Sequence, residues 1–272
     1  MIRRVALLLT VWLAALWAIL SPCPLLALTV TNVAGCEASG ATSVSCTTSA
    51  ATVSGAQIFT VYAIGGTNNA TISVTDSASH TYTEGTQLNG SSNIASVAPF
   101  WVLNASVVAN GGSITGSQTG GSSGNQYLSG ASISGVATSN ALDAQAAGTT
   151  STGTTPSIST GVLAQANEIV IGWILIHNGS GDTFTEAPGF TTGGTVTGGS
   201  PGAVRWAYEV VSSTSSVTYA PTLGTSEQYW TNVLSFKCTT NPCTIAVAPL
   251  LPMLGVGAND NEPWWYERRK AG

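Results

Sequence analysis

Residues 169–176 have the sequence Ile-Val-Ile-Gly-Trp-Ile-Leu-Ile, and this stretch decides the fold of the chain. It is apolar at odd and even positions alike. Because successive side chains of a strand point to opposite faces of a sheet, this pattern predicts a central strand that is covered on both sides. The middle of the hydrophobic core is therefore expected here.

Shorter strand patterns flank this central segment in both directions. Residues 70–75 alternate strictly between apolar and hydroxyl side chains, which is typical of a half-buried strand. Clusters of Gly, Asn and Ser separate the segments, and no stretch keeps a helical period. We predict an all-β protein with a single antiparallel β-sandwich, of jelly-roll or Ig-like type. Further strands are expected at residues 57–64, 80–84, 97–109, 114–119, 126–136, 204–210 and 230–236.

Charged residues make up only 7% of the 272 residues, whereas 43% are hydrophobic, and the formal net charge is −5. Between Val5 and Asn261 the only cationic side chains are Arg205 and Lys237, apart from two histidines. A surface so poor in Lys and Arg cannot neutralise a run of phosphates, so nucleic acid is excluded as a partner. Anionic lipid surfaces are disfavoured for the same reason.

The N-terminus has the layout of a secretory signal peptide. Arg3 and Arg4 precede an apolar run at residues 5–20, and a small residue, Ala27, precedes the expected cleavage site. Two alternatives remain open: an uncleaved membrane anchor, and lipidation of Cys23. The expected location is secreted or cell surface, and contact with a membrane is expected only through an uncleaved segment.

The expected organisation is a signal peptide at residues 1–27, a β-sandwich domain at 28–243 and a tail at 244–272. The tail is first apolar, with Pro249 and Pro252, and then aromatic and basic. Two prolines in so short an apolar run exclude a regular membrane-spanning helix. We expect an irregular tail that docks on the sandwich or on a partner.

Four cysteines follow the signal segment as two close pairs, Cys36 with Cys46 and Cys238 with Cys243. Export to an oxidising compartment favours disulfides, and local pairing is the preferred connectivity. Crossed pairing between the two ends of the domain stays open. Neither spacing is typical of a zinc site.

Several of these segments resemble a loosely defined group of secreted bacterial and phage-associated β-sandwich domains. The resemblance covers most of residues 55–237 and implies an extracellular location and a sandwich fold, without catalytic residues. It is carried by residues 74–76 with 81–83, 139–143, 166–172, 207–211 and 230–237.

Aromatic side chains are the candidates for ligand binding. Sugars stack on exposed Trp and Tyr, so a flat aromatic strip would bind a glycan. Core positions are the competing interpretation. The candidates are Trp101, Trp206, Tyr208, Tyr229 and Trp230.

Catalytic and metal-binding patterns are weaker. Asp76, His80 and Glu84 lie around one expected turn, where Asp76 would act as a cap. Asp182 and Glu186 are weak calcium candidates, since their spacing matches no defined calcium loop. No cofactor or resident metal is expected.

Lys237 is the single lysine of the body. It raises the alternative of an isopeptide crosslink to Asn232 or another Asn beside a buried acid such as Glu168. A solvated lysine at the end of a strand is the simpler interpretation.

The favoured function is an exported, non-enzymatic structural or adhesive protein, with polysaccharide or surface proteins as partners. The alternative is a carbohydrate-binding module, which requires exposed Trp and Tyr side chains. A hydrolase is the third hypothesis, and it requires Asp76, His80, Glu84 or Asp182 to converge in one pocket.

Overall fold

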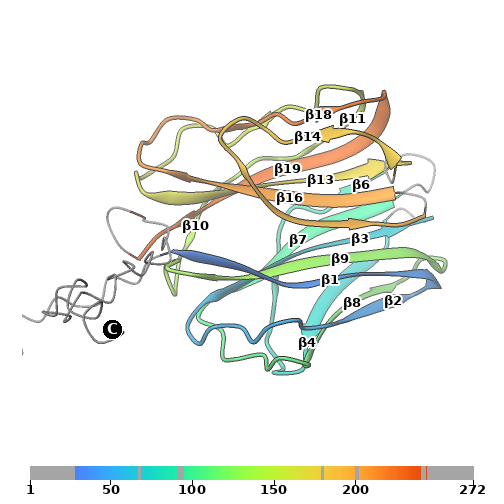
Figure 1. Ribbon diagram of the computed structural model, residues 1–272, viewed down its shortest axis with the longest axis horizontal. Coiled ribbons are helices and arrows are strands. Elements are labelled where there is room, and N and C mark those ends of the chain that lie inside the picture. Colours follow the sequence, from blue (N-terminus) through green and yellow to red (C-terminus); the bar gives the residue numbers. More distant parts are fainter. Residues whose placement is uncertain are drawn as a thin grey trace, which may run out of the picture.

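The computed structural model describes residues 28–66, 69–90, 95–178, 181–199, 202–239 and 243. All regular structure in these residues is β-strand, and every strand pairing is antiparallel. No helix that could span a membrane occurs among them. The prediction of an all-β, antiparallel sandwich is confirmed, and Figure 1 shows the sheets stacked in layers.

The predicted central strand is β13 (Glu168–His177), which lies in the middle of a six-stranded sheet, here called sheet III. Its odd-numbered side chains, such as Ile171 and Trp173, face the main core, and Val170 and Ile174 face the other side. All four are fully buried. The strand order of sheet III is β10 (Leu142–Gln145), β19 (Glu227–Lys237), β13, β16 (Gly202–Val211) and β15 (Thr191–Thr197), and β11 (Thr149–Gly153) also pairs with β19.

A second six-stranded sheet, sheet II, packs against the inner face of sheet III. Phe59 of sheet II contacts Trp206 and Phe236 of sheet III, with ring centroids 5.8 and 6.5 Å apart. These edge-on ring contacts form the centre of the main core. The strand order of sheet II is β1 (Thr29–Ala41), β9 (Gly124–Ser134), β3 (Gln57–Gly65), β7 (Ala95–Val102) and β5 (Thr83–Glu84), and β6 (Leu88–Asn89) also pairs with β7.

Sheet II is covered on its other face as well, by a three-stranded sheet I with the order β2 (Ser43–Thr47), β8 (Ser113–Thr119), β4 (Thr71–Asp76). Ile58, Tyr62 and Ile64 of β3 point into this second core. Figure 1 shows sheet I below sheet II and sheet III above it. A two-sheet sandwich would leave these side chains in water, so the apolar character of both faces of β3 requires the third layer.

The outer face of sheet III is closed by two short ribbons and their loops. Tyr219 is fully buried, and its ring lies over Gly172, where an added Cβ would be 2.3 Å from the ring. Gly172, which lies within residues 169–176, therefore leaves room for the ring of Tyr219, a residue far away in the sequence. The ribbons are β12 (Ile158–Ser159) with β17 (Thr218–Tyr219), and β14 (Phe184–Thr185) with β18 (Thr222–Leu223).

Both disulfides have the expected local connectivity. Cys36 of β1 bonds Cys46 of β2 and so links sheet II to sheet I. Cys238 bonds Cys243 just beyond β19. Two disulfides fit an oxidising compartment. The predicted signal peptide at residues 1–27 and the tail at 244–272 lie outside the described residues.

Candidate functional site

Trp206 and Tyr208, the pair that could have formed a sugar-binding strip, lie on the core side of β16. Trp206 is fully buried, and its Nε1 donates a hydrogen bond to Oγ of Ser129, 3.0 Å away. Tyr208 is half-buried, with its ring centroid 6.4 Å from that of Trp206. The indole is thus held between the sheets, with its polar atom paired inside the protein.

The remaining aromatic candidates are also interior. Trp230 is fully buried, Trp101 is 5% exposed and Tyr229 is 7% exposed. Trp101 packs on Phe236, with ring centroids 5.5 Å apart. Of the two interpretations left open by the sequence, the core interpretation fits these residues, because both faces of their strands are covered by further layers.

Asp182 and Glu186, the calcium candidates, lie near a cationic side chain of the protein itself. Arg205 is close enough to both carboxylates to interact electrostatically, and its guanidinium lies 4.5 Å from the ring centroid of Phe184. Asp182 also accepts a hydrogen bond from the Thr225 amide at 3.2 Å. In the described part of the chain, no group of three or more His, Cys, Asp or Glu side chains is arranged to hold a metal ion.

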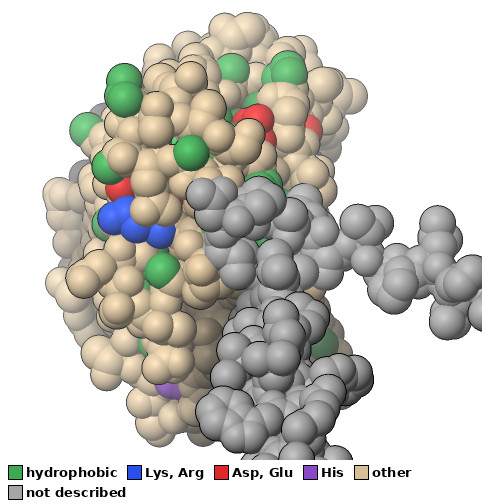
Figure 2. Space-filling model, turned by 90° about the vertical axis from the view of Figure 1, so that its left-hand side faces the viewer, with side chains coloured by type: hydrophobic (Ala, Val, Ile, Leu, Met, Phe, Trp, Pro, Cys, Tyr) green, Lys and Arg blue, Asp and Glu red, His purple; other side chains and the backbone are tan. Residues whose placement is uncertain are grey.

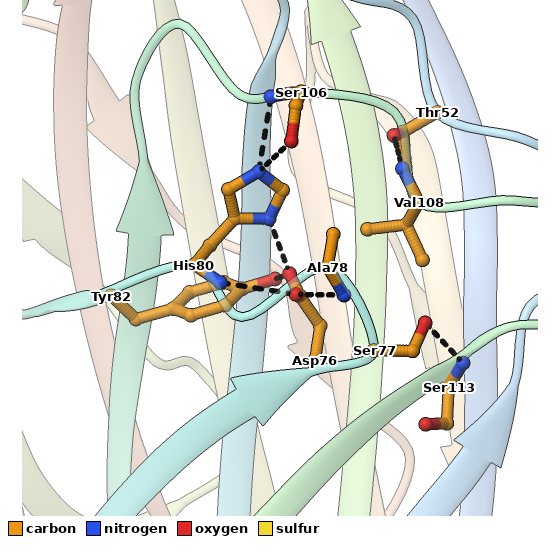
Figure 3. Close-up of polar contacts among 9 residues, drawn as sticks. All are labelled: Thr52, Asp76, Ser77, Ala78, His80, Tyr82, Ser106, Val108 and Ser113. Carbon is orange, nitrogen blue, oxygen red and sulfur yellow. Dashed lines mark hydrogen bonds and ion pairs between the residues drawn. The ribbon is translucent and has the colours of Figure 1, made fainter.

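Asp76, His80 and Ser106 form a hydrogen-bonded network in which the Asp76 side chain is buried and Ser106 is exposed (Figure 3). Nδ1 of His80 lies 2.7 Å from Oδ2 of Asp76, and Nε2 lies 2.8 Å from Oγ of Ser106. Asp76 ends β4, His80 lies in the following turn, and Ser106 lies between β7 and β8. Carboxylate, imidazole and hydroxyl are thus aligned in the order used by serine hydrolases.

Hydrogen bonds around this network define its protonation. The Ser106 amide donates to Nε2 of His80 at 3.0 Å, so Nε2 is an acceptor and Nδ1 carries the proton given to Asp76. Tyr82 donates its hydroxyl to Oδ2 of Asp76 at 2.9 Å, and the Ala78 amide donates to Oδ1 at the same distance. Burial raises the pKa of Asp76, but the hydrogen bonds from His80 and Tyr82 lower it more, and the net pKa is below the ordinary value.

Of the three residues expected around one turn, Asp76 and His80 belong to the network and Glu84 does not. Asp76 caps the turn as expected, with its carboxylate bonded to the amides of Ala78 and His80. Glu84 lies on β5 with an exposed side chain and is not among the hydrogen-bond partners of Asp76 and His80. Ser106 was not found from the sequence, because a lone serine in a loop carries no motif.

The outer face of sheet I is a second candidate surface, here called the hydroxyl face. Every outward-pointing residue of β2, β8 and β4 is a serine or threonine, and the side chains between them point into the core. Pairing aligns them in rows such as Ser45, Thr115 and Thr75. The residues of the hydroxyl face are Ser43, Ser45, Thr47, Thr71, Ser73, Thr75, Ser113, Thr115, Ser117 and Thr119.

No protein family matches the chain, and no curated protein and no solved structure was found to be similar to it. The resemblance to secreted bacterial and phage-associated sandwich domains therefore stays a prediction.

Proposed function

We propose that the chain is an exported, non-enzymatic β-sandwich protein with a structural or adhesive role, and that the hydroxyl face is its contact surface. This ordered, uncharged face is the observation that supports the proposal. The two disulfides and the predicted signal peptide favour a location at the cell surface or in the extracellular space. Charged side chains are also sparse on the face drawn in Figure 2.

The chemistry of the hydroxyl face suits a neutral polyhydroxylated partner. Each hydroxyl can donate one hydrogen bond and accept others. Neighbouring strands are about 4.8 Å apart, and alternate residues of one strand about 7 Å, so the hydroxyls form a regular grid. Ser45 and Thr115 already bond each other at 2.8 Å, which fixes their orientation. We therefore favour a neutral polysaccharide as the partner over a charged macromolecule.

The test is binding of the disulfide-intact protein to immobilised neutral polysaccharides. A triple substitution Thr71→Val, Thr75→Val and Thr115→Val removes hydroxyls while it keeps side-chain shape. We expect it to reduce binding at least tenfold, and we expect binding by the wild type to change little with salt, since no charges meet.

Thr191→Val with Thr197→Val on β15 is the matched control, because both threonines are exposed on another sheet. Equal binding by the wild type and the triple variant would overturn the assignment of the hydroxyl face. Absence of binding to every neutral polysaccharide would do the same.

A serine hydrolase is the second candidate, favoured by the alignment of Asp76, His80 and Ser106. Ser106 is exposed, so a substrate can reach its hydroxyl. It ranks second because the Ser106 amide also donates to Nε2 and competes with the hydroxyl for the one lone pair there. The hydrogen bond from the Ser106 amide to Nε2 is typical of a contact that holds two loops together.

A fluorophosphonate probe distinguishes the two roles. A catalytic Ser106 would be labelled covalently, and labelling would disappear in Ser106→Ala but persist in the control Ser77→Ala. An unlabelled wild-type protein would exclude this site as an activated nucleophile.

A further inference from the structure

The ends of three neighbouring strands bring together a lysine and two acids. Lys237 is the last residue of β19, and Glu168, the first residue of β13, is its direct partner in the pairing of these strands. Asp143 lies on β10, which pairs with β19 from the other side. The order β10, β19, β13 therefore places all three residues at one end of sheet III.

The amine and the Asp143 carboxyl are adjacent and shielded. Nζ of Lys237 lies 3.4 Å from Oδ1 of Asp143, whose side chain is only 3% exposed. Oδ2 of Asp143 accepts a hydrogen bond of 2.7 Å from the Ala164 amide, which fixes the carboxyl group. The lysine side chain is 31% exposed. Water thus has little access to the carboxyl carbon, while the nitrogen lies close to it.

Glu168 is the third member of this cluster, and simple ion pairing does not account for it. It is fully buried, and neither of its oxygens has a hydrogen-bond partner of normal geometry, although Ser235, Asp143 and Lys237 are near. Burial, followed by the proximity of Asp143, raises the pKa of Glu168 to about 7. A buried acid that exchanges its proton near neutral pH thus lies beside an amine and a carboxyl group.

We propose that Lys237 and Asp143 form an intramolecular isopeptide bond, with Glu168 as the group that transfers protons between them. Such a bond would join β10 to β19 covalently. The inference goes beyond the proposed function and does not depend on it. The sequence pointed to Asn232 as a partner of Lys237, but Asn232 lies five residues away on the same strand, opposite Trp173, and its Oδ1 accepts the Val233 amide.

The step balances without a further reactant. A proton from the Lys237 ammonium passes by way of Glu168 to the Asp143 carboxylate, which leaves a neutral amine and a carboxylic acid. Nζ forms a bond to Cγ while the electron pair of the carbonyl π bond moves to Oδ2. Nζ then loses one more proton, which Glu168 delivers to Oδ1, the oxygen protonated in the first step. The Cγ–Oδ1 bond breaks, its electron pair leaves with Oδ1 as water, and the double bond to Oδ2 forms again. The products are one amide and one water, and Glu168 returns to its initial state. The proximity of the reacting groups replaces external activation of the carboxyl group.

Because lysine and arginine are scarce in the chain, digestion with trypsin gives a clear test of the isopeptide bond. Arg205 is the only tryptic site between Val5 and Lys237, so trypsin separates the fragment with Asp143 from the fragment with Lys237. Neither disulfide joins these two fragments, because Cys36–Cys46 lies within the first and Cys238 and Cys243 both follow Lys237, so after reduction only an isopeptide bond can hold them together.

The experiment uses the full chain, purified with its disulfides intact, then denatured, reduced and digested. We expect one branched species that contains both fragments, no cleavage after Lys237, and an intact mass lower than the reduced sequence requires by one water molecule. Two separate fragments and an unchanged mass would overturn the proposal and leave Lys237 and Asp143 as an ion pair.

Substitutions then test the roles of the three residues. Lys237→Arg and Asp143→Ala should abolish the branched species, and Glu168→Gln should abolish it or slow its formation at least tenfold. Glu227→Gln, at the other end of β19, is the matched control and should remain fully linked. Linkage in Lys237→Arg, or linkage in Glu168→Gln as fast as in the wild type, would contradict the assigned roles.

Discussion

The Asp76 side chain, at the end of β4, holds the following turn in place through hydrogen bonds and, by way of His80, the loop that carries Ser106. Its carboxylate accepts hydrogen bonds from His80, Tyr82 and the Ala78 amide. Burial and the neighbouring carboxylate raise the pKa of Tyr82, so its hydroxyl stays a donor. The turn after β4 is thereby fixed to the loop that carries Ser106.

We predict that Asp76→Asn destabilises the protein at pH 7 by about 1–3 kcal/mol, because hydrogen bonds to a charged acceptor are lost. The pKa of Asp76 is lowered in the folded state. Its contribution is therefore complete above the unfolded-state pKa of about 4 and is lost as pH falls through the lower folded-state pKa. Urea unfolding between pH 7 and pH 3 should show the difference between variant and wild type shrinking with acid. A constant difference across this range would contradict the assignment, and Asp182→Asn is a half-exposed control.

At the scale of elements, the edge strand β1 shows how sheets I and II are joined. Among the described strands, β1 pairs only with β9, and its Cys36 is bonded to Cys46 on β2. Cys46 is 2% exposed and belongs to the core between these two sheets. The bridge therefore fixes sheet I, which carries the hydroxyl face, to the edge of sheet II.

We predict that the double substitution Cys36→Ala and Cys46→Ala lowers the free energy of unfolding by about 2–3 kcal/mol, because the unfolded chain regains the entropy of an open loop. Urea denaturation monitored by tryptophan fluorescence measures this loss. Cys238→Ala with Cys243→Ala is the control, since that bridge spans a sequence separation of 5 rather than 10 and should contribute less. The reverse ranking of the two double variants would show that strain or residual structure outweighs loop entropy.

Considered as a whole molecule, the protein is a stack of three sheets with a further cover of short ribbons over sheet III. Trp173, Trp206 and Trp230 are all fully buried within this stack. The layers use the large aromatic side chains for packing, and they leave the Ser- and Thr-rich side of sheet I as an ordered outer surface. The hydroxyl face and the Asp76 network, rather than an aromatic strip, are therefore the candidate functional surfaces of the described residues.

The sequence alone predicted much of this architecture. The doubly apolar pattern at residues 169–176 identified β13 as a central strand, and the alternation at residues 70–75 identified β4 as half-buried. These features are local, because the period of side chains along a strand follows from backbone geometry. The preferred disulfide pairing also followed from short spacings, since a short loop costs little to close.

Contacts between distant residues could not be predicted in this way. The sequence left open whether Trp206 is exposed to solvent or buried, because the pattern of β16 does not show how many layers cover that strand. Ser106 meets His80 only because the β7–β8 loop reaches the turn after β4. The sequence by itself thus determined the all-β class, the two-sided character of the central strand β13, the half-buried character of β4 and the scarcity of charged side chains. Only the tertiary structure decided that Asp143, Glu168 and Lys237 meet, because strand order and register depend on the packing of the whole core and not on any local period.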